Sequence, residues 1–165
     1  MERSTLQRRG IILALLIASP WLLCQVWIAV GAPDEAFPTM PNCPDTSSNC
    51  AHLGGGESYR MDGTYALTLN ATVEQVWSNV DQYIEDSGSE VLFEKTTMEG
   101  ERYIHFVERS SFWRFPDDVA VSVSPLGDGT MCQLELHSQS RLGQSDLGVN
   151  PNRIEDLYNV LADGS

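Results

Sequence analysis

The chain has 165 residues and a formal net charge of −13, from 10 Lys and Arg against 23 Asp and Glu. Residues 1–32 carry three Arg and one Glu, or +2, so residues 33–165 carry −15 with a single lysine. A surface this acidic repels phosphate backbones and anionic lipid head groups, which excludes nucleic-acid binding. The roughly 130 residues after the first segment are enough for one domain with its own core.

Residues 1–32 predict a helix that anchors the chain in a membrane. An apolar run from Ile11 to Val30 follows three arginines and is interrupted only by Ser19, Pro20 and Gln25. Twenty helical residues span about 30 Å, and the positive flank is expected to stay in the cytoplasm. We therefore expect a single-pass signal anchor in the inner membrane, with the rest of the chain in the periplasm or an equivalent exported space.

A cleaved signal peptide is the alternative interpretation of the same residues. Val30-Gly31-Ala32 fits a small-x-small cleavage site. The apolar core of a signal peptide, however, usually has only about 7–15 residues. Length favours the uncleaved anchor.

Residues 33–63 are expected to form an extended tether, because prolines and a glycine run (Pro33, Pro38, Pro41, Pro44 and Gly54-Gly55-Gly56) disfavour long regular structure. Cys43 and Cys50 lie in a turn-rich part of this segment and predict a disulfide in an oxidising compartment. A zinc site that includes His52 is the less favoured alternative, since only three suitable ligands are local. Cys132 alternates with two leucines, which is typical of a buried thiol.

Residues 64–165 show the pattern of a folded domain. An alternating strand is predicted over 65–69, followed by a helix that begins with a capping box at Thr72 and Gln75 and ends at Asp86-Ser87-Gly88. Four strands follow, at 90–97, 102–109, 118–124 and 131–138. A final helix is expected to start with Asn150 as its cap and Pro151 in its first position.

The order strand, helix, four strands, helix predicts an α+β domain of two layers. Short turns between consecutive strands imply a mainly antiparallel sheet of five strands, and the two helices are expected to cover one face of it.

Two polar segments are expected to meet at one end of this sheet: residues 112–118, which enter one strand, and residues 140–150, which leave the next. Together they supply the candidate site residues Asp117, Asp118, Arg141, Ser145, Asp146, Asn150 and Arg153. We expect Arg141 to contact Asp117 or Asp118 as a fork-shaped ion pair. The two aspartates are neighbours on a strand and point to opposite faces, so they do not form a catalytic dyad.

This constellation has two interpretations. In the first, the charged network orders the loop and positions the last helix. In the second, the residues line a ligand cleft, and Arg141 or Arg153 holds a small anionic group near the helix terminus at Asn150. No nucleophile elbow, phosphate loop, dinucleotide fingerprint or zinc-protease motif occurs, so no catalytic residue, cofactor or metal is assigned. His105 and His137 are expected in structural roles.

Several of these segments together resemble the domain-of-unknown-function family numbered 1499. The resemblance rests on Cys43-Pro44 with Asn49-Cys50, on Phe115-Pro116-Asp117-Asp118-Val119, and on the long pattern from Ser140-Arg141 through Asn150 to Arg153-Ile154. It covers approximately residues 41–162. Ala51-His52-Leu53 stands where members usually have Val-Ser-Ser. The resemblance implies an exported or membrane-associated protein and supplies no reaction.

The sequence leaves three functions open. The leading one is a membrane-anchored module that binds a small ligand or a membrane-protein partner at the Asp117/Arg141 end of the sheet. The second is an envelope hydrolase or transferase that uses Asp117 or Asp118 with Arg141. The third is a structural subunit of a membrane complex, which would have no cleft.

Overall fold

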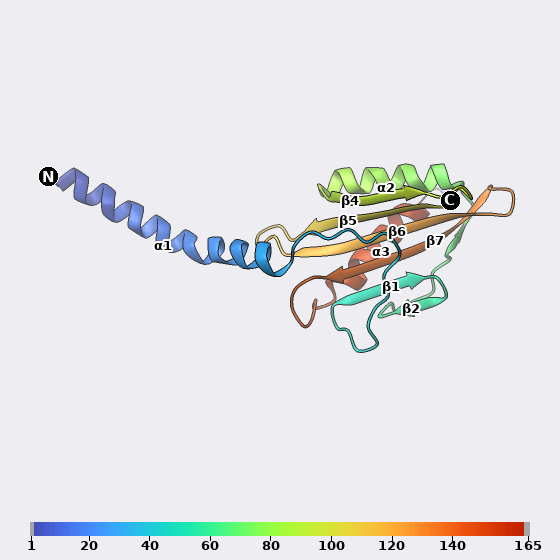
Figure 1. The fold of residues 1–165 in the computed structure, drawn as a ribbon, viewed down its shortest axis with the longest axis horizontal. Coiled ribbons are helices and arrows are strands. Elements are labelled where there is room, and N and C mark those ends of the chain that lie inside the picture. Colours follow the sequence, from blue (N-terminus) through green and yellow to red (C-terminus); the bar gives the residue numbers. More distant parts are fainter. Residues whose placement is uncertain (1, 164–165) are drawn as a thin grey trace.

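The computed structural model describes residues 2–163, which form one long helix followed by an α+β domain. Helix α1 (Glu2–Gly31) projects from one end of the domain (Figure 1). Its segment Gln7–Gly31 contains an 18-residue window with a mean hydropathy of 2.2 that is almost entirely exposed, so the helix is long and apolar enough to cross a membrane. The predicted N-terminal apolar helix is confirmed.

The domain is built on one antiparallel sheet in the order β2-β1-β7-β6-β5-β4, with a short strand β3 also paired to β7. The strands are β1 (Cys50–Gly54), β2 (Glu57–Tyr59), β3 (Thr68–Leu69), β4 (Glu90–Thr96), β5 (Arg102–Arg109), β6 (Pro116–Leu126) and β7 (Met131–Ser140). Helices α2 (Val73–Ser87) and α3 (Val149–Ala162) pack on the same face of this sheet. The predicted α+β class is confirmed.

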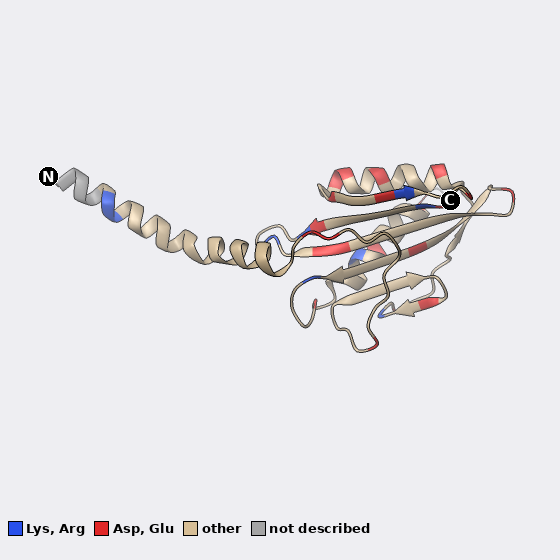
Figure 2. Ribbon diagram, viewed as in Figure 1, with Lys and Arg blue, Asp and Glu red and all other residues tan. Residues whose placement is uncertain are grey.

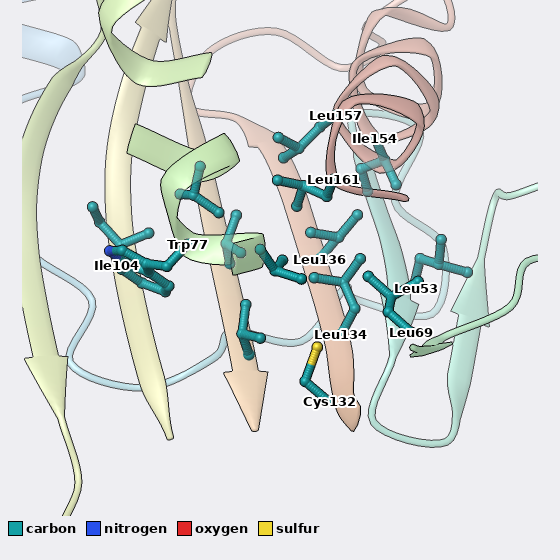
Figure 3. Close-up of a cluster of buried hydrophobic side chains, with 14 of the residues drawn as sticks. Leu53, Leu69, Trp77, Ile104, Cys132, Leu134, Leu136, Ile154, Leu157 and Leu161 are labelled. Atoms are coloured by element: carbon teal, nitrogen blue, oxygen red, sulfur yellow. The ribbon is translucent and has the colours of Figure 1, made fainter. Parts of the chain in front are cut away.

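The core lies between the sheet and the two helices (Figure 3). Alternate residues of β6, Val119, Val121 and Val123, face the helices and are fully buried. Trp77 of α2 and Leu157 of α3 fill the space above them. Because side chains alternate along a strand, this burial also determines which residues of β6 point away from the helices. It therefore decides on which face each polar residue at the start of the strand lies.

Both predicted ends of α2 are present. The Thr72 side chain accepts from the Gln75 amide, and the Gln75 side chain accepts from the Thr72 amide, which completes the capping box. At the other end Gly88 has φ +62° and closes the helix in the left-handed conformation.

The sheet has more strands than the five we expected. Strands β1 and β2 come from residues 33–63, and the strand predicted over 65–69 is reduced to the two residues of β3. The glycine run is the physical reason: a Cβ on Gly54, at φ +122°, would lie 2.7 Å from the Cα of Glu135. Glycine at this position lets β1 approach β7 closely and turn into β2. The glycine run, which we expected to disfavour regular structure, therefore joins two strands.

The first part of the tether segment also lies on the domain, across the sheet face that the helices leave open. The Phe37 ring stacks on His105 with ring centroids 4.4 Å apart, and the Tyr103 hydroxyl donates to the Thr39 carbonyl at 2.9 Å. Figure 1 shows this segment crossing the strands on its way from α1 to β1. Residues 33–63 thus form part of the domain's structure rather than a free extended linker.

Candidate functional site at the anchor end of the sheet

The two polar segments singled out in the sequence do meet. The β5–β6 connection and the β7–α3 loop lie at the end of the sheet where α1 joins the domain (Figure 1). Asp117 is paired across the ladder with Ser140, and Asp118 with Gln139. Because β6 alternates, Asp117 points to the helix face and Asp118 to the open face. The site therefore has two separate charged networks.

On the helix face, Arg153 contacts four groups, from β5, β6, β7 and α3 itself. It donates to Asp117 Oδ2 at 2.7 Å, to Ser138 Oγ at 3.0 Å and to Asn150 Oδ1 at 2.9 Å, and its Nε lies 3.0 Å from Glu108 Oε1. Burial alone lowers the pKa of Arg153, but Asp117 and Glu108 outweigh it and the pKa is raised. The guanidinium stays charged and fixes α3 to the sheet.

Asn150 is not the helix cap that we expected. The N-cap is Gly148, which has no side chain of its own to cap the helix. Asp146 supplies the missing acceptors: its carboxylate takes the amide of Gly148 at 2.9 Å and that of Asn150 at 3.2 Å. A carboxylate offers more acceptor sites at a helix N-terminus than an amide does.

Asn150 is consequently free to join three segments. Its Nδ2 donates to the Asn49 carbonyl at 2.9 Å, to Ser140 Oγ at 3.0 Å and to Asp146 Oδ2 at 2.8 Å. The Ser145 hydroxyl accepts from the Leu147 amide in a local turn, and the Ser145 backbone forms an isolated parallel bridge with Ser48.

Arg60, which directly follows the β1–β2 hairpin, also belongs to this network. It binds both oxygens of Asp146, at 2.8 and 3.0 Å. Burial raises the pKa of Asp146, but the bonds from Arg60, Gly148 and Asn150 outweigh it and lower the pKa from 3.8 to about 2. No sequence pattern indicated a role for Arg60, because its partner lies 86 residues away in the chain.

On the open face, Arg141 and Asp118 form the bidentate pair that we expected. Arg141 Nε donates to Asp118 Oδ2 at 2.9 Å and Arg141 Nη2 to Oδ1 at 2.7 Å. His105 Nε2 lies 2.8 Å from the same carboxylate, and Arg141 also binds Asp34, just after α1. Burial raises the pKa of Asp118, but His105 and Arg141 outweigh it and the pKa is lowered. This network ties the start of the tether segment to the sheet.

The geometry restricts what these residues can do chemically. His105 Nδ1 accepts the Phe37 amide at 3.0 Å, so the ring hydrogen is on Nε2 and both nitrogens are engaged. Asp117 and Asp118 are each bound to an arginine on opposite faces. Arg141 and Arg153 are in turn occupied by carboxylates of the chain itself, and Asp146 occupies the start of α3. The two arginines and the start of α3, where we expected an anionic ligand, are thus occupied by carboxylates of the chain itself.

The networks border a pocket of about 350 Å³ that the sequence did not reveal. Its wall is mainly apolar, and its polar edge includes three of the predicted residues, Asp117, Ser145 and Asp146. The apolar lining comes from α1, the β5–β6 connection, the β7–α3 loop and the start of α3: Trp27, Phe115, Leu142, Leu147 and Val149. Leu147 is 93% exposed, an unusual state for a leucine, but this exposure is known only from the structure, so no sequence pattern marked the pocket.

Helix α1 contacts the β5–β6 connection next to this pocket. Trp21 Nε1 donates to the Phe112 carbonyl and Gln25 Nε2 to the Trp113 carbonyl, both at 2.9 Å. Trp27 meets Phe115 edge to face, with centroids 6.4 Å apart. The rings of Phe112 and Trp113 remain exposed. Figure 2 shows acidic residues spread over the domain, whereas the part of α1 nearest the domain carries no charge.

The cysteines adopt the expected states. Cys43 and Cys50 form a disulfide with a Cα–Cα distance of 5.7 Å. Cys132 is a fully buried thiol, and burial raises its pKa.

Comparison with known proteins identifies a family. A family model described as a protein of unknown function (DUF1499) matches residues 35–161. The chain belongs to the DUF1499 family. The match begins within the tether segment, ends in the last turn of α3 and leaves out α1. No curated protein and no solved structure matches the chain significantly.

Proposed function

We propose that this DUF1499 protein is a membrane-anchored binding module whose pocket beside α1 takes the acyl chain of a zwitterionic or uncharged lipid. The observation that carries the proposal is the position of the pocket. An apolar hollow of about 350 Å³ opens directly beside the one helix, among the described residues, that is long and apolar enough to cross a membrane.

The contacts of α1 support a location at the bilayer surface. Trp21 lies ten residues before Gly31, or about 15 Å along the helix. Since Trp21 holds the Phe112 carbonyl, an α1 that spans from Ile11 to Val30 brings the β5–β6 connection below the level of Gly31, toward the hydrocarbon core. The exposed rings of Phe112 and Trp113 are apolar surfaces suited to contact with lipid there.

The charges near the pocket favour an uncharged acyl chain as the ligand. Arg141 and Arg153, the two arginines that we expected to hold an anion, are saturated by internal carboxylates, and residues 33–165 carry −15, which disfavours an anionic head group at this end of the sheet. The same saturation weakens the hydrolase or transferase alternative, because Asp117 and Asp118 have no free role as a base. The pocket itself weakens the alternative of a purely structural subunit.

The orientation follows from the arginines before Ile11, which favour a cytoplasmic N-terminus and a periplasmic or equivalent location for the domain. The Cys43–Cys50 disulfide supports an oxidising compartment. A phosphatase that needs export for activity, fused after Ser165, should be active, and a reporter that functions only in the cytoplasm should be silent there. The reverse pattern would contradict the orientation.

Photo-crosslinking tests the ligand. The full-length protein is reconstituted into phosphatidylcholine vesicles that contain phosphatidylcholine with a diazirine in one acyl chain, and labelled peptides are mapped by mass spectrometry. We expect label on the loop with Leu142 and Leu147 as well as on α1, which serves as the internal reference.

Two tryptophan variants make this test specific. Val149→Trp fills the pocket without removing apolar surface, so it should reduce labelling of the loop several-fold while α1 labelling stays constant. Met98→Trp is the matched control, because Met98 is fully exposed at the opposite end of the sheet. Label confined to α1, or equal loop labelling in wild type and Val149→Trp, would refute lipid binding, as would a protein captured there in place of lipid.

A further inference from the structure

A second cluster of reactive groups lies away from the pocket, where the disulfide meets the open face of the sheet. Cys50 Sγ is 3.6 Å from His137 Nε2, and the ligand atoms of Cys43, Cys50 and His137 all lie within 4.8 Å of one another. The three residues come from the tether segment, β1 and β7. The β1–β7 pairing sets His52 opposite His137 and so fixes the group.

The hydrogen bonds around His137 determine which of its nitrogens faces the sulfur as an acceptor. His52 Nε2 lies 3.3 Å from both the Gly54 carbonyl and Glu135 Oε1; since both are acceptors, that nitrogen carries the hydrogen. His52 Nδ1 is then free to accept from His137 Nδ1, 3.3 Å away. This leaves the lone pair of His137 Nε2 directed at the sulfur of Cys50, and Gln139 can turn its amide NH₂ toward the same nitrogen.

The chain from His137 through His52 to Glu135 is the arrangement that orients histidine ligands in metal sites. His137 is completely buried, and its Nε2 lies beside the two cysteine sulfurs, so that the ring is held where it can bind a cation.

Access to the cluster is through Cys43. Cys50 is 1% exposed, but Cys43 is half-buried and borders a hollow of about 420 Å³ whose other walls include Asn42, Glu57 and Tyr59. A thiol reductant can therefore reach one sulfur of the disulfide, which is the condition for thiol–disulfide exchange.

We propose that reduction of the Cys43–Cys50 disulfide opens a site for one Cu(I) ion, bound by the two thiolates and His137 Nε2. A dithiol reductant supplies two electrons and two protons, so that the S–S bond breaks, two thiols form and the reductant becomes a disulfide. Both thiols release their protons to solvent when the cation binds. Soft thiolates select Cu(I) or zinc, and a set of three donors suits Cu(I), whereas zinc requires a fourth ligand to complete a tetrahedron.

A competition titration tests the site. The full-length protein carries Cys24→Ala and Cys132→Ala, which remove the other two thiols. It is reduced with a phosphine under anaerobic conditions, freed of reductant and titrated with Cu(I) against a chromophoric Cu(I) chelator. We expect one equivalent to bind to the reduced protein and none to the oxidised protein.

Variants of the cluster separate metal binding from general effects on the fold. Cys43→Ser changes the half-buried ligand and should abolish stoichiometric binding while the circular dichroism spectrum is retained; His137→Gln should do the same. Glu135→Gln leaves all three ligands in place and should weaken binding about 10–100-fold, as expected for a positioning residue. Ser124→Ala, on the same face but outside the cluster, should have no effect. The proposal is overturned if reduced protein binds no Cu(I), if it binds only zinc, or if Cys43→Ser binds Cu(I) as wild type does.

Discussion

At the residue scale, the charged side chains of the candidate site form closed sets in which each cation is matched to anions of the same chain. The pairing of Arg141 with Asp118 was predictable, because two adjacent antiparallel strands bring the end of one beside the start of the next. The further partners, Asp34 for Arg141 and Arg60 for Asp146, come from the tether segment about 90–110 residues away in the chain. Nothing in local sequence spacing indicates contacts over such separations.

Replacing Arg141 by methionine should destabilise the protein strongly. The side chain is 9% exposed and that of Asp118 2%, so Arg141→Met keeps the apolar stem but leaves a buried carboxylate without its cation. We expect the free energy of unfolding to fall by about 3–5 kcal/mol, as for a broken buried pair. Chemical denaturation of the detergent-solubilised protein measures it.

Arg114→Met is the matched control, because Arg114 is exposed in the β5–β6 connection and its replacement should cost less than about 1 kcal/mol. Equal stabilities of Arg141→Met and wild type would show that the Arg141–Asp118 pair does not hold the structure together.

At the element scale, the start of α3 shows how a local rule was overridden by a better acceptor. Asn150 followed by proline is typical of a helix cap, yet the carboxylate of Asp146 lies four residues earlier and takes the amides instead. In α2, where Thr72 and Gln75 have no such competitor, the capping box formed as the sequence predicted. The strands β4–β7 were likewise predictable from alternation, whereas β1 depends on the close approach of Gly54 to β7, a tertiary contact.

Acid should remove the contribution of Asp146 to stability. Its pKa falls from 3.8 in the unfolded chain to about 2 in the folded protein, so the unfolded state binds more protons between these values and stability rises with pH there. The contribution is complete above about pH 5 and is lost as the pH falls through 3.8 toward 2. Because Arg60 is about a quarter exposed and partly screened, we expect on the order of 1–2 kcal/mol.

Denaturation of wild type and Asp146→Asn between pH 6 and pH 2 measures this contribution as the difference between the two stabilities, which should shrink as the pH falls. Asp81→Asn, on the exposed side of α2, controls for the loss of one negative charge and should show no such trend. A difference that is independent of pH would mean that Asp146 acts without its charge.

At the scale of the whole molecule, the anchor and the domain meet where the pocket opens. The sequence predicted the apolar helix and the end of the sheet that carries polar residues, because both depend on composition and strand order. It did not predict the pocket, which requires Trp27 of α1, Phe115 and Leu147 to converge from three segments. The two charged networks hold these segments in place. A network that orders the loop and a pocket beside it, which we had considered as alternatives, therefore occur together at the same end of the domain.

If the pocket takes an acyl chain, this end of the domain, with the pocket rim, must face the bilayer. The most direct measurement is the accessibility of a nitroxide label attached through an iodoacetamide at Leu147→Cys, in full-length protein that lacks Cys24 and Cys132 and is reconstituted into phosphatidylcholine vesicles. Met98→Cys carries the reference label at the far end of the sheet. We expect the Leu147 label to collide readily with oxygen, which concentrates in the bilayer, and rarely with a water-soluble nickel chelate, while the Met98 label shows the opposite. A Leu147 label as accessible to the nickel chelate as the Met98 label would contradict a membrane-facing pocket.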